Sequence, residues 1–125
     1  MTTILVVDDE PLIAMALEGE LEDAGYGVVT AANGRQGLER LAEAQVDLVL
    51  LDMMMPVMSG PAMLKAMAAD PSLGAIPVIV LSSLPEATIR AHADGVAEIL
   101  RKPYTADEIL GAIARVLGKV REART

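Results

Sequence analysis

Three short segments of this chain consist of consecutive aliphatic residues, and they constrain the fold more than any other feature. They are Ile4 to Val7, Leu48 to Leu51 and Val78 to Leu81. Continuous apolar runs of this length are typical of parallel strands that are covered on both faces, whereas a strand with one face in water alternates apolar and polar residues. A weaker run from Gly27 to Thr30 and a short one from Glu98 to Leu100 bring the predicted strands to five.

Segments with helical spacing separate these strands. The first follows Pro11, has apolar residues three and four apart from Ile13 to Ala24, and is ended by Gly25. The second and fourth lie around Leu38 to Ala42 and from about Pro85 to Ala93. The third, around Met63 to Met67, is preceded by Ser59 and Pro61, and the fifth, from Ile109 to Val120, is preceded by a capping box of Thr105 and Glu108. Strands and helices therefore alternate throughout. This pattern predicts an α/β fold, a doubly wound five-stranded parallel sheet with five helices, in the flavodoxin-like order 2-1-3-4-5.

The length of 125 residues suits one domain. We assign residues 1–121 to it and expect residues 122–125 to form a short, frayed C-terminal tail. Aromatic residues make up only 2% of the chain, and Phe and Trp are absent. The core is therefore predicted to be aliphatic.

Charge and composition exclude several classes of function. The formal net charge is −8, and the ten basic residues are scattered, so the chain lacks the concentrated positive surface that nucleic-acid binding requires. The absence of cysteine excludes disulfides and thiol chemistry. No apolar run approaches the roughly 20 residues of a membrane span. We expect no nucleic acid as a partner, no membrane insertion and a cytoplasmic location.

Polar residues follow the predicted strands. Asp8, Asp9 and Glu10 follow the first strand, Asp52 the third and Ser82 the fourth, and Lys102 follows the fifth. Ligands of doubly wound sheets bind outside the carboxyl ends of the strands, near the point where strand order reverses. In the predicted order the first and third strands are neighbours, so Asp8, Asp9 and Asp52 should form one acidic cluster, with Ser82 and Lys102 beside it.

Crowded carboxylates repel one another unless a cation offsets their charge. Mg²⁺ prefers oxygen ligands and binds well to one or two carboxylates together with a phosphate. A carboxylate nucleophile, a metal, a lysine and a hydroxyl are the groups needed to transfer a phosphoryl group to an aspartate.

Each of these residues also has an interpretation without function. Asp9 and Glu10 can cap the first helix, Asp52 and Lys102 can be ordinary loop residues, and Ser82 can cap the fourth helix. The functional interpretation is favoured because all of these groups occur together at one edge of the predicted sheet.

Four motifs resemble, in order and spacing, those of response-regulator receiver domains. They are LVVDDE, LVLLDMMMPVMSG, VIVLSS and ILRKPY, and the resemblance covers nearly the whole chain. It implies that Asp52 is the phosphoacceptor, which takes a phosphoryl group from a phosphohistidine. Ser82 then corresponds to the switch hydroxyl and Lys102 to the lysine that pairs with the phosphoryl group, and the bond before Pro103 is expected to be cis. By the same resemblance Mg²⁺ is held by Asp8, Asp9, Asp52 and the backbone carbonyl of Met54.

The chain departs from the family pattern at Ile99, where an aromatic switch residue is usual; Tyr104 is not that switch residue. We expect a single-domain regulator or phosphorelay shuttle that is a monomer or a phosphorylation-dependent dimer. Its expected partners are a sensor histidine kinase or histidine phosphotransfer protein and a downstream output protein. Such a protein catalyses its own phosphorylation and dephosphorylation but is no conventional turnover enzyme. The alternative is a phosphorylation-independent interaction module with the same fold. A phosphatase is disfavoured because Asp8 and Asp9 are adjacent rather than in an Asp-x-Asp pattern.

Overall fold

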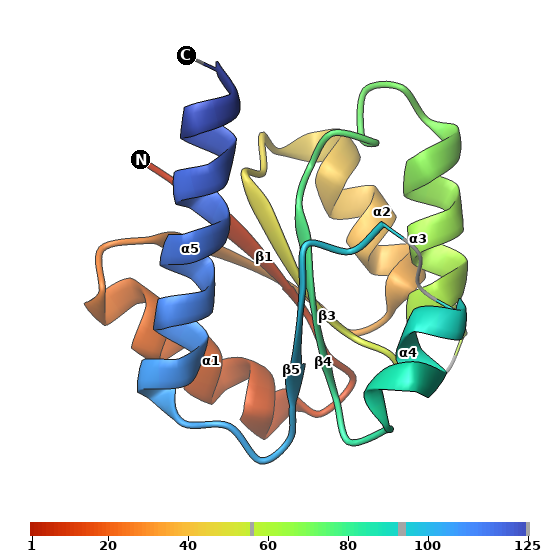
Figure 1. Cartoon of the computed structure of the whole chain (residues 1–125), viewed down its shortest axis with the longest axis horizontal. Helices are drawn as coiled ribbons and strands as arrows, with labels where there is room; N and C mark the ends of the chain where they lie inside the picture. The colour runs from red at the N-terminus through yellow and green to blue at the C-terminus, as the bar shows by residue number, and fades with distance from the viewer. Residues whose placement is uncertain (56, 93–94, 125) are drawn as a thin grey trace.

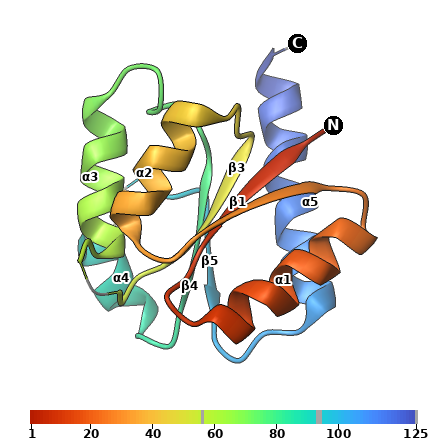
Figure 2. The ribbon, with the colours of Figure 1, turned by 180° about the vertical axis from the view of Figure 1, so that it is seen from behind.

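The computed structural model describes residues 1–55, 57–92 and 95–124, and these residues form a central parallel sheet with helices on both faces (Figures 1 and 2). The strands are β1 (Thr3–Val7), β2 (Gly27–Ala31), β3 (Leu48–Asp52), β4 (Val78–Ser82) and β5 (Glu98–Arg101). The helices are α1 (Pro11–Asp23), α2 (Gly34–Glu43), α3 (Gly60–Ala69), α4 (Glu86–His92) and α5 (Ala106–Arg124). The strand order is β2-β1-β3-β4-β5, which confirms the predicted flavodoxin-like order.

The two faces of the sheet bury two separate aliphatic cores, because successive side chains of a strand point to opposite faces. One core joins the sheet to α2, α3 and α4, and its helical members include Leu41, Met63, Met67 and Ile89. The other joins the sheet to α1 and α5 through Leu17, Leu21, Ile109, Ile113 and Val116. Every residue of β3 and β4 is buried. This two-sided burial is the reason that the sequence shows continuous apolar runs.

The helix ends follow local capping chemistry. Ser59 Oγ accepts a hydrogen bond of 3.3 Å from the backbone N–H of Ala62 at the start of α3. At α5 the predicted capping box is confirmed: Thr105 Oγ1 accepts from the Glu108 N–H at 3.1 Å, and Glu108 Oε1 accepts from the Thr105 N–H at 3.2 Å.

One alternative interpretation and one expectation about helix ends are not supported. Glu10 occupies the N-cap position of α1, but its side chain makes no capping hydrogen bond, so the capping interpretation of this residue is not supported. The helix α5 continues to Arg124, so residues 122–124, which we expected to fray, extend the last helix. The end expected for the fourth helix, Ala93, lies outside the described residues.

Strand register brings the site residues to one edge of the sheet. Val7 lies opposite Leu51 in the parallel β1–β3 pair, so Asp8 and Asp52 are the next residues on two neighbouring strands. Ser82 pairs with Arg101 at the ends of β4 and β5. This edge lies at the bottom of Figure 1, where β4 leads into α4 and β5 into α5.

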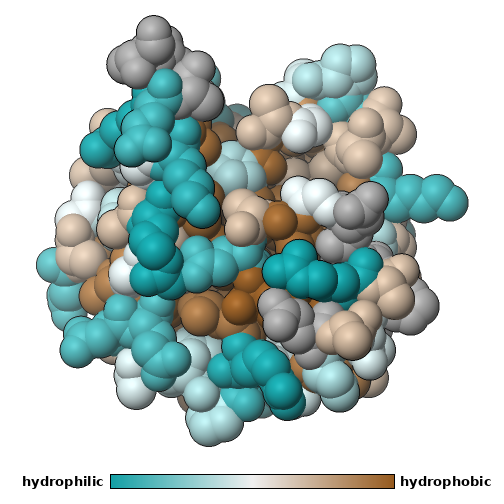
Figure 3. All heavy atoms as spheres, in the orientation of Figure 1, coloured by the Kyte–Doolittle hydropathy of each residue, from teal (hydrophilic) through white to brown (hydrophobic). Residues whose placement is uncertain are grey.

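The outer side of α5 is hydrophilic, as its amphipathic sequence predicts. In Figure 3 hydrophilic residues follow this helix, while hydrophobic residues reach the surface between α5 and α4. Among the helices of the described residues, no segment has the length and apolar character needed to cross a bilayer.

Candidate functional site

Asp52 is the last residue of β3, and its neighbours fix it at the edge of the sheet. Only 7% of the residue is exposed. Its Oδ1 lies 3.7 Å from Nζ of Lys102, which follows β5. The backbone N–H of Lys102 donates a 2.9 Å hydrogen bond to the carbonyl oxygen of Ser82. The peptide bond between Lys102 and Pro103 is cis, as expected.

The carboxyl of Asp52 titrates above the ordinary value of 3.8. Burial is the main reason that its pKa is raised, because desolvation disfavours the charged form. The positive charge of Lys102 and a hydrogen bond from the Met54 backbone act in the opposite direction, while Asp8 and Asp9 raise the pKa further. The site therefore holds more negative charge than its one lysine balances.

Asp8 is buried at the end of β1, with 3% of the residue exposed. Its Oδ1 accepts a 2.9 Å hydrogen bond from the backbone N–H of Glu10. Its Oδ2 is buried and has no hydrogen-bond partner, the single such atom found among the described side chains. A buried carboxylate oxygen without a partner costs free energy, so this atom fits a cation ligand.

The carboxylates of Asp8, Asp9 and Glu10 offer oxygen atoms that all lie within 4.8 Å of one another. Such a set of hard oxygen donors suits Mg²⁺. Glu10 was not among the metal ligands predicted from the sequence, and the structure places its carboxylate next to those of Asp8 and Asp9. The Asp-Asp-Glu run of the sequence was the available signal, but a run alone does not distinguish a ligand from a cap.

Ser82 ends β4 and is 3% exposed. Its Oγ accepts a 3.1 Å hydrogen bond from the backbone N–H of Leu84. The hydroxyl therefore orders the turn after β4, well before α4 begins at Glu86. This position places an alcohol at the same edge as Asp52 and Lys102.

The loop after β3 packs closely against Asp52. The backbone N–H of Gly60 donates a 3.1 Å hydrogen bond to the carbonyl oxygen of Met53. A Cβ atom at Gly60 would lie 2.8 Å from the carbonyl oxygen of Asp52, so no side chain fits there without displacement. Met53 is 4% exposed, whereas the next residue, Met54, is 67% exposed. The side chain of Met53 thus lies in the core and that of Met54 in the solvent, directly after Asp52.

Two residues near the site are packed into opposite cores. Ile99, at the position of the usual switch aromatic, packs against the core beneath α2, α3 and α4. Tyr104 packs against the core beneath α1 and α5. Burial raises the pKa of Tyr104 to about 12, with further contributions from Asp8, Glu20 and Asp52. Tyr104 therefore stays a neutral phenol beside the acidic residues.

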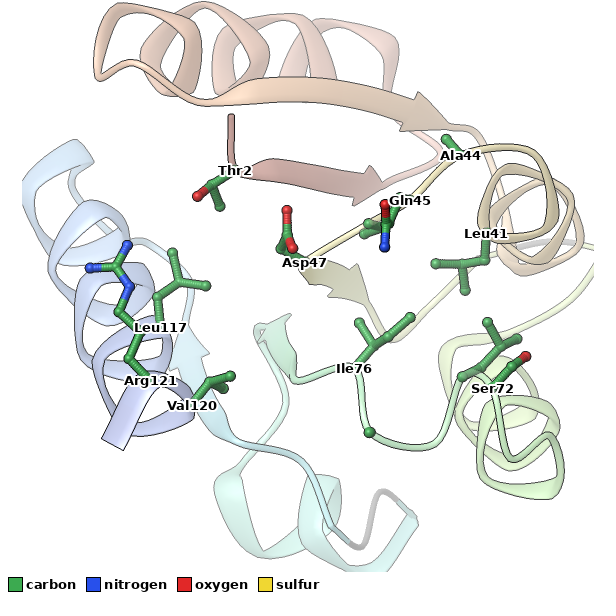
Figure 4. Close-up of a pocket in the computed structure, with 13 residues that line it drawn as sticks. Thr2, Leu41, Ala44, Gln45, Asp47, Ser72, Ile76, Leu117, Val120 and Arg121 are labelled. Atoms are coloured by element: carbon green, nitrogen blue, oxygen red, sulfur yellow. The ribbon is translucent and has the colours of Figure 1, made fainter. Parts of the chain in front are cut away.

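A cavity of about 460 Å³ lies away from the site, at the other edge of the sheet, where residues such as Asp47, Ile76 and Arg121 line it (Figure 4). None of the predicted site residues contributes to it. A smaller cavity of about 260 Å³ beside α1 is lined by Asp8 and Asp9.

Comparison with known proteins finds relatives over nearly the whole chain. The family model of the response regulator receiver domain matches residues 4–114. Protein PilH of Pseudomonas aeruginosa is 32% identical over 119 residues, which cover 94% of this chain and 98% of that protein. The DNA-binding dual master transcriptional regulator RpaA of Synechocystis is also 32% identical over 119 residues, but this chain spans only 49% of its length.

A solved structure gives the same result for the fold. The chemotaxis protein CheY4 of Vibrio cholerae superposes with a TM-score of 0.84 at 34% identity, over 93% of this chain and 98% of that one. The strand order, the polar strand ends and the match over residues 4–114 lead to one conclusion. The chain belongs to the family of response regulator receiver domains of two-component signalling.

Proposed function

We propose that Asp52 accepts a phosphoryl group from a phosphohistidine in a Mg²⁺-dependent reaction, and that this modification changes the affinity of the chain for its partners. The observation that carries the proposal is the partly buried pair of Asp52 and Lys102, whose Oδ1 and Nζ lie 3.7 Å apart at the acidic edge of the sheet. A carboxylate nucleophile and a cation for the transferred group are thereby adjacent.

In the proposed transfer a carboxylate oxygen of Asp52 forms a bond to phosphorus as the bond between phosphorus and the donor histidine nitrogen breaks. The product is an acyl phosphate and a free histidine. Lys102 neutralises charge on the transferring oxygens, which is the main catalytic contribution in phosphoryl transfer. The Ser82 hydroxyl accepts a hydrogen bond from the Leu84 N–H, and its own hydrogen is available to donate to a phosphoryl oxygen.

The residues present fit the metal that this reaction needs. Asp8, with its partnerless Oδ2, and Asp9 would hold Mg²⁺, together with Asp52 and the Met54 carbonyl. When bound, Mg²⁺ neutralises phosphoryl oxygens and offsets repulsion among the carboxylates. Burial is the main cause of the raised pKa of Asp52, and repulsion by Asp8 and Asp9 adds to it.

Exposed apolar side chains beside the site support docking of a partner protein. Leu12 and Met15 on α1 are 80% and 64% exposed, and Met54 and Val57 in the loop after β3 are 67% and 76% exposed. Met15 lines the same cavity as Asp8 and Asp9, which places its exposed side chain beside the site. We propose that a sensor histidine kinase or a histidine phosphotransfer protein contacts this rim, and that the chain acts in the cytoplasm with its donor.

Incubation with Mg²⁺ and acetyl phosphate tests the proposal. Intact mass should show the gain of one acid-labile phosphoryl group, which is lost in Asp52→Asn and in the presence of EDTA. Asp47→Asn, at an exposed aspartate on the other edge of the sheet, is the matched control and should be phosphorylated like the native chain. An unmodified native chain would overturn the proposal.

Ile99 favours one alternative, an interaction module that binds its partner regardless of phosphorylation. Its aliphatic side chain packs against the core and offers no aromatic ring to follow the movement of Ser82. Amide NMR spectra with and without beryllofluoride, a phosphoryl mimic, separate the two. Shifts that extend from Ser82 to β5 and α5 support the switch, whereas shifts confined to the Asp52 neighbourhood support the module.

A further inference from the structure

The cavity of about 460 Å³ at the edge of the sheet away from the acidic site has both aliphatic and charged residues in its lining. Its volume lies within the range of roughly 300–1,000 Å³ that is typical of small-molecule sites. The two aliphatic cores meet there, because Leu41 and Val46 belong to one core and Leu117 packs against the other. Figure 4 shows Leu117 and Arg121 on the α5 side of the cavity and Leu41 on the α2 side, with Asp47 between them. The cavity thus presents an aliphatic surface together with a carboxylate and a guanidinium.

Asp47, directly before β3, is fixed in place by two hydrogen bonds with Thr3. The backbone N–H of Asp47 donates a 2.8 Å hydrogen bond to the carbonyl oxygen of Thr3, and Oδ2 of Asp47 accepts a 2.8 Å hydrogen bond from the N–H of Thr3. The carboxylate is therefore oriented before any ligand binds, which favours a specific contact. Its second oxygen, Oδ1, can accept a charge-assisted hydrogen bond from an ammonium group.

Arg121 supplies the positive charge of the cavity. It lies on α5 one turn after Leu117 and next to Val120, so the three residues lie on one face of the helix. Arg121 is exposed, and it takes part in none of the ion pairs found within the described part of the chain. A guanidinium binds a carboxylate through two parallel N–H donors. Arg121 can therefore bind the carboxylate of a ligand whose apolar part lies against Leu117 and Val120.

The lining selects for a ligand that is a zwitterion with an aliphatic group. The net charge of −8 disfavours a ligand with net negative charge. A ligand with net positive charge would leave Arg121 without a carboxylate. An aliphatic group gains free energy when it leaves water for the surface formed by residues such as Leu41, Ile76 and Leu117.

We propose that this cavity is a binding site for a free aliphatic α-amino acid. The carboxylate of the ligand binds Arg121, its ammonium group binds Asp47, and its side chain packs against the aliphatic lining. The inference does not depend on the phosphorylation of Asp52, because the cavity contains none of the residues of that site.

NMR titration of the native chain with L-leucine, in EDTA and without a phosphoryl donor, tests the inference. Amide shifts should saturate and should be largest around Asp47, Ile76 and Arg121. Three analogues each lack one group of leucine: leucinamide lacks the carboxylate, 4-methylpentanoate lacks the ammonium, and glycine lacks the aliphatic side chain. The first two should bind about 2- to 5-fold more weakly than leucine, the effect of one exposed ion pair, and glycine should bind about 10-fold more weakly or less tightly still.

Two variants assign each ligand group to its partner. Asp47→Asn keeps an oxygen that can accept from the N–H of Thr3 but removes the charge, so leucine and 4-methylpentanoate should bind it equally well. Arg121→Gln should bind leucine and leucinamide equally well. Arg35→Gln, at an exposed arginine on α2 that pairs with Glu39 and does not line the cavity, is the control and should keep both differences.

Four results would overturn the inference. Leucine that causes no saturable shifts, or shifts centred on the acidic edge of the sheet, would show that the cavity does not bind it. Equal binding of leucine and all three analogues would show an unspecific contact. Differences between leucine and its analogues that persist in both variants would show that Asp47 and Arg121 do not recognise the ligand. Shifts at the cavity that change on dilution of the chain without leucine would show that a second copy covers it.

Discussion

Nζ of Lys102 lies 3.7 Å from Oδ1 of Asp52, although β4 lies between β3, which ends at Asp52, and β5, which Lys102 follows. The lysine side chain thus reaches across the end of the intervening strand, and the two side chains are only 24% and 9% exposed. Solvent screens such a partly buried pair less than a surface pair. The charge state of Asp52 therefore depends on this lysine.

Replacement of Lys102 by Met should raise the pKa of the Asp52 carboxyl further. Lys102 is the strongest influence that opposes the effect of burial, and its loss leaves the repulsion from Asp8 and Asp9 unbalanced. A titration of side-chain carboxyl ¹³C shifts by NMR, without Mg²⁺, measures the change. Lys65→Met, at an exposed position on α3, should leave the Asp52 titration unaltered. A lowered or unchanged pKa in Lys102→Met would contradict the electrostatic role of the lysine.

Asp52→Asn should stabilise the metal-free chain at neutral pH. Because the folded-state pKa of Asp52 is raised above 3.8, the folded state holds the proton more tightly than the unfolded state does. The free energy of unfolding therefore falls as pH rises from the unfolded value through the raised folded value, and asparagine removes this loss.

Urea unfolding of both proteins, in EDTA and at a series of pH values from 3 to 7, measures the difference. The free energy of unfolding of Asp52→Asn, relative to that of the native chain, should increase with pH between the unfolded-state and folded-state pKa values of Asp52. Above the folded-state pKa the difference should stay constant. An advantage that shrinks with increasing pH would mean that the pKa of Asp52 is lowered, not raised.

Mg²⁺ should stabilise the native chain against unfolding, because it binds the folded site. Saturation to 100 times the dissociation constant corresponds to about 2.7 kcal/mol in the free energy of unfolding. Thermal denaturation with Mg²⁺ and with EDTA should show a shift in Tm that Asp9→Asn loses and Glu10→Gln keeps. The two variants distinguish the ligand set implied by the family, which lacks Glu10, from a ligand set made of Asp8, Asp9 and Glu10. If Glu10→Gln loses the shift as well, Glu10 belongs to the ligand set.

Gly60→Ala should destabilise the chain by about 1–3 kcal/mol, because its Cβ would meet the carbonyl oxygen of Asp52 and Cα of Met53, each at 2.8 Å. Gly19→Ala is the matched control in the interior of α1, where no atom lies within 4 Å of the added Cβ. It should stabilise by roughly 0.5–1 kcal/mol, the helix penalty of glycine. Urea unfolding checks both; equal effects would show that the contact at Gly60 is unimportant.

The sheet and its order could be predicted from the sequence because burial on both faces leaves a strong local signal. The apolar runs beginning at Ile4, Leu48 and Val78 all lie within strands, and even the weak run at Gly27 forms β2. The capping box of α5 could also be predicted, because Thr105 and Glu108 are only three positions apart in the sequence and hydrogen-bond to each other. Such local patterns need no knowledge of distant contacts.

The site was predictable as a set of residues but not as a set of contacts. The order of the strands placed Asp8, Asp52 and Lys102 at one edge of the sheet. The ion pair of Lys102 with Asp52, however, reaches across the end of β4, and the sequence does not reveal whether the two side chains meet there. The partnerless oxygen of Asp8 likewise results from burial by several elements. For Glu10 the sequence allowed helix capping, the commoner role for an acid at that position, but its side chain makes no capping hydrogen bond and lies beside Asp8 and Asp9.

Borohydride reduction of the chain after treatment with acetyl phosphate and Mg²⁺ tests the central claim most directly. Borohydride converts an aspartyl phosphate to homoserine, so the modified residue is marked permanently and can be located by peptide sequencing in the mass spectrometer. The account predicts homoserine at position 52, and none when Mg²⁺ is removed before the donor is added. Homoserine at another aspartate, or a phosphorylated chain with aspartate intact at position 52, would contradict it.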